Sequence, residues 1–191
     1  MVRWFSIFLL SALVCTLGLL KIRGATAQEP VFSPSTPPVV DGTTYTGHCH
    51  RSPPEDFDGM VREAAALYGI NPNILALTVY RESGCDMNAL GGAGEIGLTQ
   101  VHPRVWAKKL QREGVIQEAT DLWSPEINLR AGAFILAHNA KRAKEDAWGT
   151  LRRYNGAGPK ARAYATEQAN HYRELWEEEP WVVESGEGSA Y

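Results

Sequence analysis

The sequence predicts one compact all-α domain over residues 55–178 of a 191-residue chain. Apolar residues recur there at intervals of three and four, which is the period of a helix with one buried face. No stretch shows the sustained alternation that a half-exposed strand requires. Prolines and glycines fall between the periodic stretches, where helices begin and end. Together these observations predict five or six helices packed into a single domain.

The first two predicted helices differ in how much of their surface is apolar. The first, over residues 57–68, has apolar residues along one face and ends at Gly69. The second begins with Asn71 as its cap and Pro72 in its first turn. Only a threonine is polar among residues 74–80, and a helix that is apolar on all sides is a buried helix.

Four further helices are predicted from periodic stretches, two of which open with a proline. A cluster of four glycines over residues 91–97 separates the second helix from the third. The sequence leaves open whether this segment forms a short hairpin. The predicted helical ranges are 103–114, 124–144, 150–155 and 161–178.

The N-terminal segment has the composition of an export signal. Arg3 precedes an apolar run over residues 4–20, and a small-residue triplet ends at Ala27. We interpret residues 1–27 as a signal peptide that is cleaved after Ala27, which predicts a periplasmic protein. Because the run is long and basic residues follow it, an uncleaved inner-membrane anchor is the alternative.

Two further segments lie outside the predicted domain. Residues 28–54 contain six prolines among serine, threonine and glycine, which predicts a proline-rich arm or linker. Residues 179–191 are acidic and glycine-rich, which predicts a flexible tail. Without residues 1–27 the chain has 16 basic and 22 acidic residues, a net charge of −6, and this argues against nucleic acid as a partner.

Two cysteines remain after the predicted cleavage, Cys49 and Cys85. In an exported protein they predict a disulfide, which stabilises a fold by roughly 3 to 4 kcal/mol in the chain-entropy model. The alternative is two unpaired thiols. His48 and His50 flank Cys49, but their spacing matches no zinc site, so neither a metal nor another cofactor is predicted.

The predicted buried helix ends in a carboxylate. Glu82 follows Arg81 at a helix C-terminus, where burial and the negative end of the helix dipole both disfavour the charged form. We therefore expect a raised pKa for Glu82, as cleavage of a glycosidic bond requires of a general acid. The alternative is an exposed helix-end glutamate that pairs with Arg81.

Four sequence blocks occur in the order of a known family. After Glu82-Ser83 come Gly-Glu-Ile-Gly-Leu-Thr-Gln over 94–100, Asn-Leu-Arg-Ala-Gly over 128–132 and Arg-Tyr-Asn-Gly-Ala-Gly over 153–158. In this order the blocks resemble the soluble lytic transglycosylases and their relatives, the goose-type lysozymes. The resemblance implies a lysozyme-like helical fold with a long cleft for the glycan strands of peptidoglycan.

The resemblance also implies roles for individual residues. Glu82 would be the catalytic acid and base, Ser83 and Gln100 would line the cleft, Tyr154 would lie near the glutamate, and Asn155 would touch substrate. From the residues alone, the alternative for Tyr154 is a core aromatic, and the alternative for Asn155 is a residue that ends a helix.

The family's mechanism requires one catalytic carboxylic acid and forms a 1,6-anhydro ring on MurNAc instead of admitting water. A hydrolytic goose-type lysozyme is the alternative, and it needs a second carboxylate, for which Asp86 and Glu95 are the candidates. A glycan-binding assembly protein without turnover is the third hypothesis. Small exported enzymes of this type often accompany secretion or conjugation machinery, which makes such machinery a candidate partner of a monomeric enzyme.

The sequence departs from the family pattern at two places. Thr99 stands where the family commonly has a methionine that packs against the bound sugar. The family often has an acidic residue four positions before a tyrosine. Before Tyr172 that position holds Gln168, with Glu167 beside it, and neither receives a role.

Overall fold

The computed structural model of the chain describes residues 44–144 and 146–176. This part is helical and contains no strand, which confirms the all-α prediction. The predicted signal peptide, most of the proline-rich arm and the acidic tail lie outside it. None of its helices has the length and apolar content that a membrane span requires. Its elements are η1 Thr46–His48, α1 Phe57–Tyr68, α2 Pro72–Glu82, α3 Pro103–Arg112, η2 Ala119–Trp123, α4 Pro125–Arg142, α5 Ala147–Tyr154 and α6 Gly158–Trp176.

The ends of α1 and α2 are where the sequence predicts them. Gly69 ends α1 in the left-handed conformation, with φ 62°, which a glycine adopts without steric cost. The Asn71 side chain caps α2 by accepting a hydrogen bond from the Asn73 N–H at 2.8 Å. All residues from 73 to 80 are buried, so α2 is the buried helix that its composition indicates.

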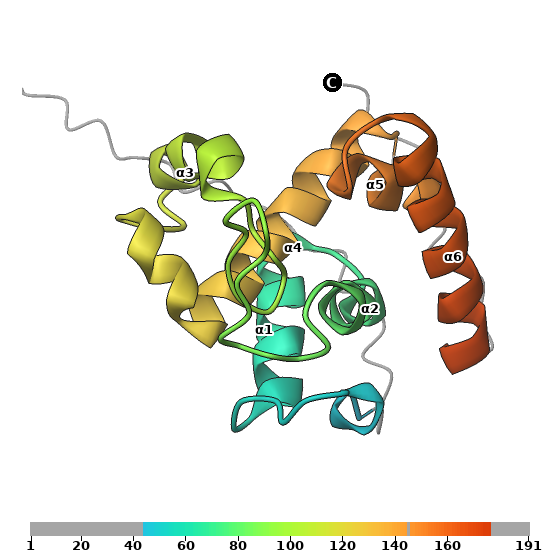
Figure 1. The fold of residues 1–191 in the computed structure, drawn as a ribbon, viewed down its shortest axis with the longest axis horizontal. Helices are drawn as coiled ribbons and strands as arrows, with labels where there is room; N and C mark the ends of the chain where they lie inside the picture. The colour runs from blue at the N-terminus through green and yellow to red at the C-terminus, as the bar shows by residue number, and fades with distance from the viewer. Residues whose placement is uncertain (1–43, 145, 177–191) are drawn as a thin grey trace, which may run out of the picture. The chain divides into compact units, whose positions relative to one another are not determined.

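The helix α4 runs from beside α1 to α5 (Figure 1), and its buried residues contribute to two hydrophobic clusters. It packs with α1, α2, α5 and η2. The larger cluster holds the buried apolar residues of α1 and α2 together with Tyr164, Ala165 and Tyr172 of α6, and the smaller one includes Val101, Leu110 and Leu122. Tyr154, at the end of α5, packs against both clusters. The pocket described below lies at this junction.

The glycine-rich segment forms a tight loop that is fixed to α4. Only isolated antiparallel bridges occur in it, from Ile96 to Leu90 and to Val101, so the described residues contain no extended hairpin there. Asn128 of α4 holds the loop: its Nδ2 donates to the Ile96 carbonyl at 2.8 Å, and its Oδ1 accepts from the Thr99 N–H at 2.9 Å. Two of the sequence blocks therefore meet as one structural unit.

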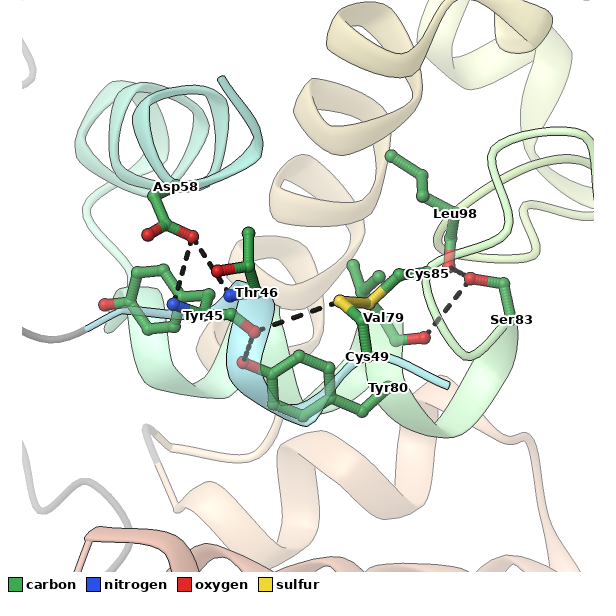
Figure 2. The surroundings of a disulfide bond; sticks show 9 residues. All are labelled: Tyr45, Thr46, Cys49, Asp58, Val79, Tyr80, Ser83, Cys85 and Leu98. Atoms are coloured by element: carbon green, nitrogen blue, oxygen red, sulfur yellow. Dashed lines mark hydrogen bonds between the residues drawn. A yellow bond between two sulfur atoms is a disulfide. The ribbon is translucent and has the colours of Figure 1, made fainter. Parts of the chain in front are cut away.

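The predicted disulfide between Cys49 and Cys85 is present, which confirms that pairing (Figure 2). It ties the segment before α1 to the turn that follows α2. Tyr45 in the same segment is fully buried and accepts a 2.7 Å hydrogen bond from the Tyr80 hydroxyl at its carbonyl. The Arg51 N–H donates to the carbonyl of Gly84 at 2.9 Å. The end of the predicted arm is thus part of the folded domain.

Two helices begin earlier than the sequence predicts, and the short helix η2 is not predicted. The helix predicted from residue 150 begins at Ala147, because the Asp146 side chain caps it by accepting from the Gly149 N–H at 2.7 Å. The helix predicted from residue 161 begins at Gly158, directly after the preceding turn. The short helix η2 has no counterpart in the prediction. The N–H groups of Gln117 and Glu118 donate to the Asp121 side chain at the start of this helix. Contacts between residues so close in sequence leave no periodic pattern of apolar residues from which the helix could be predicted.

Candidate active site

A pocket of about 330 Å³ is lined by residues from three of the four sequence blocks, all except the block over 128–132. Its walls come from the end of α2, the glycine-rich loop, α3, α4 and the end of α5. It brings together four of the five residues that the sequence assigns to catalysis or substrate binding, all except Ser83. The lining residues are Glu82, Glu95, Gln100, Val101, His102, Val105, Trp106, Ile135, Arg153, Tyr154, Asn155 and Gly156.

Glu82 is the last residue of α2 and brings its carboxyl to the pocket. Burial raises the pKa of this carboxyl above its usual value, a hydrogen bond from Tyr164 and the charge of Arg81 act to lower it, and the charge of Glu95 raises it. The net shift is upward, as the sequence predicts. Arg81 forms its ion pair with Glu167 at 3.0 Å, so the alternative of a simple pair between Glu82 and Arg81 is wrong.

Tyr164 of α6 is the site residue that the sequence analysis missed. Its hydroxyl donates a 2.8 Å hydrogen bond to Glu82 Oε1. Burial and the neighbouring Glu82 carboxylate both raise the pKa of the hydroxyl far above its usual value, so Tyr164 stays a donor at any physiological pH. The signal in the sequence is the four-residue spacing of Tyr164, Gln168 and Tyr172, all of which are buried. That spacing places their side chains on the inner face of α6.

Tyr154 combines the two roles considered for it. It packs in the core, and its hydroxyl donates to the Thr99 carbonyl at 2.8 Å. Burial raises its pKa, and the Glu82 carboxylate contributes to the rise, which places the two side chains in electrostatic contact. Thr99 itself is fully buried and donates its hydroxyl to Asn128, so the side chain at this position faces α4 and not the pocket.

Ser83 and Gln100 both fasten the glycine-rich loop. The Ser83 hydroxyl donates to the Leu98 carbonyl at 2.7 Å (Figure 2), and Ser83 is not among the residues that line this pocket, so its place on the cleft wall stays a prediction. Gln100 does line the pocket. Its Nε2 donates to the carbonyls of Ala89 and Gly97 at 3.2 and 3.0 Å, which leaves Oε1 as its acceptor for a ligand.

Gly91 allows this arrangement of the loop. A Cβ at this position would lie 2.6 Å from Gln100 Oε1 and would collide with the Glu95 carboxylate. Only glycine therefore lets the two side chains fold over the backbone at this point. Gly97 is a second such position, because a Cβ there would collide with the Asn128 side chain.

The two candidate second carboxylates lie in different places. Glu95 lines the pocket, and its own N–H and that of Ala93 hold the pKa of its carboxyl below the usual value. Asp86 accepts a 2.9 Å hydrogen bond from the Asn88 N–H within the turn after α2 and does not line the pocket. Glu95 is therefore the second carboxylate of the site.

The remaining wall is aromatic and aliphatic on one side and polar on the other. Val105, Trp106 and Ile135 form the apolar part, and Trp106 also meets the His138 ring edge to face. Asn155 caps the end of α5 and is exposed at the pocket rim. No group of histidine, cysteine, aspartate or glutamate side chains in the described part of the chain is arranged to hold a metal ion.

Comparisons with known proteins show the family and the fold of this chain. The family described as "Transglycosylase SLT domain" matches residues 59–176. An X-ray structure of an inactive mutant of lytic transglycosylase Slt from Pseudomonas aeruginosa is similar with a TM-score of 0.56 and 17% identity, over 68% of this chain and 27% of that one. The 70-kDa soluble lytic transglycosylase in complex with bulgecin A is similar with a TM-score of 0.51 and 16% identity, over 61% and 19%.

This chain thus spans less than a third of the length of either solved relative. The two likenesses confirm the lysozyme-like helical fold that the sequence blocks imply. The family match covers well over half of the 191 residues. The chain therefore belongs to the transglycosylase SLT domain family.

Proposed function

We propose that this chain is a peptidoglycan lytic transglycosylase that cleaves the β-1,4 bond between MurNAc and GlcNAc. The observation that carries the proposal is the Glu82 carboxyl, which lines the pocket and has a pKa raised by burial. A carboxyl that keeps its proton towards neutral pH is the general acid that glycosidic cleavage requires. One solved relative is an inactive mutant in which a glutamate is replaced by glutamine.

The proposed reaction uses Glu82 twice. Its proton passes to the glycosidic oxygen as the bond from that oxygen to C1 of MurNAc breaks. The resulting carboxylate then accepts the proton of the C6 hydroxyl of the same sugar, and O6 bonds to C1. The products are a free 4-hydroxyl on GlcNAc and a 1,6-anhydro-MurNAc end, and Glu82 regains its proton without the entry of water.

Tyr164 supports the second half of this reaction. Its hydroxyl stays protonated and donates to Glu82 Oε1, and such a bond favours the charged form of a carboxyl. It therefore stabilises the carboxylate that exists between the two proton transfers. The same bond fixes the orientation of the Glu82 side chain at the end of α2.

We assign the other residues by where their polar atoms point. Gln100 and Asn155 line the pocket and would bind the sugar, Gln100 through its Oε1. Ser83 and Tyr154 act as positioning residues, because their hydroxyls donate to carbonyls of the glycine-rich loop. The loop then holds Gln100 in place.

Hydrolysis by a goose-type lysozyme mechanism is the second candidate, and Glu95 is the observation that favours it. Its carboxyl lines the same pocket as Glu82 and has a lowered pKa, as a base for water activation would at neutral pH. We place this candidate second because the Glu95 carboxylate already accepts N–H groups of its own loop.

Digestion of purified sacculi distinguishes the two reactions. Mass spectrometry of the soluble products should find anhydro-muropeptides, which are lighter by one water than the products of hydrolysis. Reducing ends alone would contradict the lyase reaction and support hydrolysis. A folded wild-type chain that binds sacculi without releasing products would support the third hypothesis, a glycan-binding assembly protein. Product release that survives in Glu82→Gln would contradict the assignment of Glu82.

We extend the proposal to the location of the enzyme, which would be exported to the periplasm and act there as a monomer. Fractionation of cells that express the full chain tests this. A periplasmic form whose first residue is Gln28 would support a cleaved signal peptide, and a full-length form in the membrane fraction would support the anchor. Co-purification from the same cells tests secretion or conjugation machinery as the partner.

A further inference from the structure

A guanidinium lies on the wall of the pocket that contains Glu82. Arg153 belongs to the last turn of α5 and is followed by Tyr154 and Asn155, which line the pocket as well. The Asp146 cap fixes the first turn of α5, and the hydrogen bond of the Tyr154 hydroxyl to the loop fixes its last turn. The guanidinium is thus carried by a short helix that is held at both ends.

Arg153 has no hydrogen-bond or ion-pair partner among the described residues. Glu95, the carboxylate with the lowered pKa on the same pocket, is not paired with it. In contrast, Arg81 and Arg130 form ion pairs with glutamates at 3.0 and 2.7 Å. Other surface arginines such as Arg152 also lack a protein partner in the described part of the chain, but Arg152 does not line the pocket.

The chemistry of a guanidinium indicates what it binds. Its planar fork of N–H donors matches a carboxylate, and it stays charged at any physiological pH. The sugar rings and acetamido groups of the glycan carry no charge, whereas the peptide stems attached to MurNAc carry free carboxylates. A cation on the pocket wall with no protein partner therefore has a counter-charge available on a peptide-bearing strand and little to pair with on the sugars.

The geometry points to Arg153 as a carboxylate-binding residue of the cleft, which takes a free carboxylate of the peptide stem. The inference rests on the proposed function, because that function supplies the glycan. It makes the enzyme prefer peptide-bearing strands to peptide-free ones. Arg153 acts on binding and not on the acid, since the charged residues that shift the pKa of Glu82 are Arg81 and Glu95.

The test measures binding in the absence of cleavage. The full chain carrying Glu82→Gln is titrated by calorimetry with soluble glycan strands that bear peptide stems, and with the same strands after an amidase has removed the stems. The titrations are repeated after adding Arg153→Gln, Arg153→Lys or Arg152→Gln. The last of these is the matched control, because it removes the same charge from the adjacent residue of the same helix.

Arg153→Gln should weaken the binding of peptide-bearing strands by about tenfold relative to peptide-free strands, because a charge-assisted hydrogen bond contributes a factor of this size to binding. Arg153→Lys should lose part of this preference, because it keeps the charge without the planar fork. Arg152→Gln should keep it in full. The preference should also shrink as salt is added.

Two outcomes overturn the inference. An equal effect of Arg153→Gln on both kinds of strand would show that the residue recognises no stem carboxylate. A selective loss on the peptide-free strands would assign Arg153 to the lactyl carboxylate that the amidase exposes. Failure of the proposed function looks different, because the wild-type chain would then release no anhydro-muropeptides from sacculi, whatever the titrations show.

Discussion

The end of α2 and the glycine-rich loop each bring one carboxyl to the pocket, and the two carboxyls differ in character. Glu82 ends a helix in which residues 73–80 are all buried, and burial raises its pKa. Glu95 lies on an exposed loop whose N–H groups lower its pKa. Such a separation of two neighbouring carboxyls distinguishes a proton donor from a permanent anion. In the proposed reaction, the supporting backbone thus decides which of the two glutamates is the acid.

The two regions are also anchored in different ways. The turn after α2 is tied to the segment before α1 by the disulfide and by the hydrogen bond from the Arg51 N–H to Gly84. The loop is held by the side chain of Asn128, which is 1% exposed. One anchor is covalent, and the other is a buried amide that acts through hydrogen bonds. Each can be removed separately.

The largest effect is expected at the acid itself. Glu82→Gln removes the transferable proton while keeping the size of the side chain, and kcat for release of muropeptides from sacculi should fall by about 10²- to 10⁴-fold. Glu95→Gln makes the same chemical change in the same pocket and should cause a much smaller loss. Equal losses in the two variants would remove the distinction between the carboxyls and favour hydrolysis.

The covalent anchor should contribute most to stability. Replacing Cys49 and Cys85 together by alanine should lower the free energy of unfolding by about 3 to 4 kcal/mol, because the bond restricts the unfolded chain. Urea denaturation monitored by circular dichroism measures this change. The reduced wild-type chain serves as the comparison and should unfold at a similar urea concentration. An unchanged midpoint in the double variant would contradict the stabilising role of the bond.

The buried anchor should contribute slightly less. Asn128→Ala leaves the Thr99 N–H and the Leu122 carbonyl buried without their partner, while the Ile96 carbonyl keeps the Val101 N–H, and the change should cost about 2 to 3 kcal/mol. Asn155→Ala is the matched control, since Asn155 is exposed and its loss should change stability by less than about 0.5 kcal/mol. Similar unfolding midpoints for the two variants would show that the loop is held by other contacts.

The smallest effect concerns the pKa of the acid. Tyr164→Phe removes a hydrogen bond that favours the charged form of Glu82, so the pKa of Glu82 should rise further. The alkaline limb of the pH profile of kcat/KM should then move to higher pH. Tyr68→Phe, a tyrosine outside the pocket, should leave the profile in place. A shift of the limb towards lower pH in Tyr164→Phe would show that the hydroxyl does not favour the charged form of Glu82.

The sequence predicts those features that depend on neighbouring residues. The cap at Asn71, the proline after it and the glycine that ends α1 act within one helical turn, so their effect is readable in the chain itself. The buried character of α2 follows from its composition. The pairing of Cys49 with Cys85 follows because only two cysteines lie outside the predicted signal peptide. These are short-range or counting arguments, and the structure agrees with them.

The direction of side chains at the site is not readable in this way. Tyr164 reaches Glu82 from a helix 82 residues further along the chain. The Ser83 hydroxyl turns towards Leu98, and Thr99 turns towards Asn128, because carbonyl and amide groups of other segments lie there. Each of these directions is decided by a partner that only the folded chain brings near. Family blocks therefore identify the wall of the site better than they identify the contacts behind it.

Tyr154 packs against both hydrophobic clusters and also lines the pocket. The width of the pocket is therefore coupled to how the two halves of the domain pack against each other. A substitution deep in the smaller cluster, at Leu110 for example, alters the position of this wall without touching substrate. In the proposed enzyme, substitutions in the interior can therefore change substrate preference while the residues that contact the glycan stay the same.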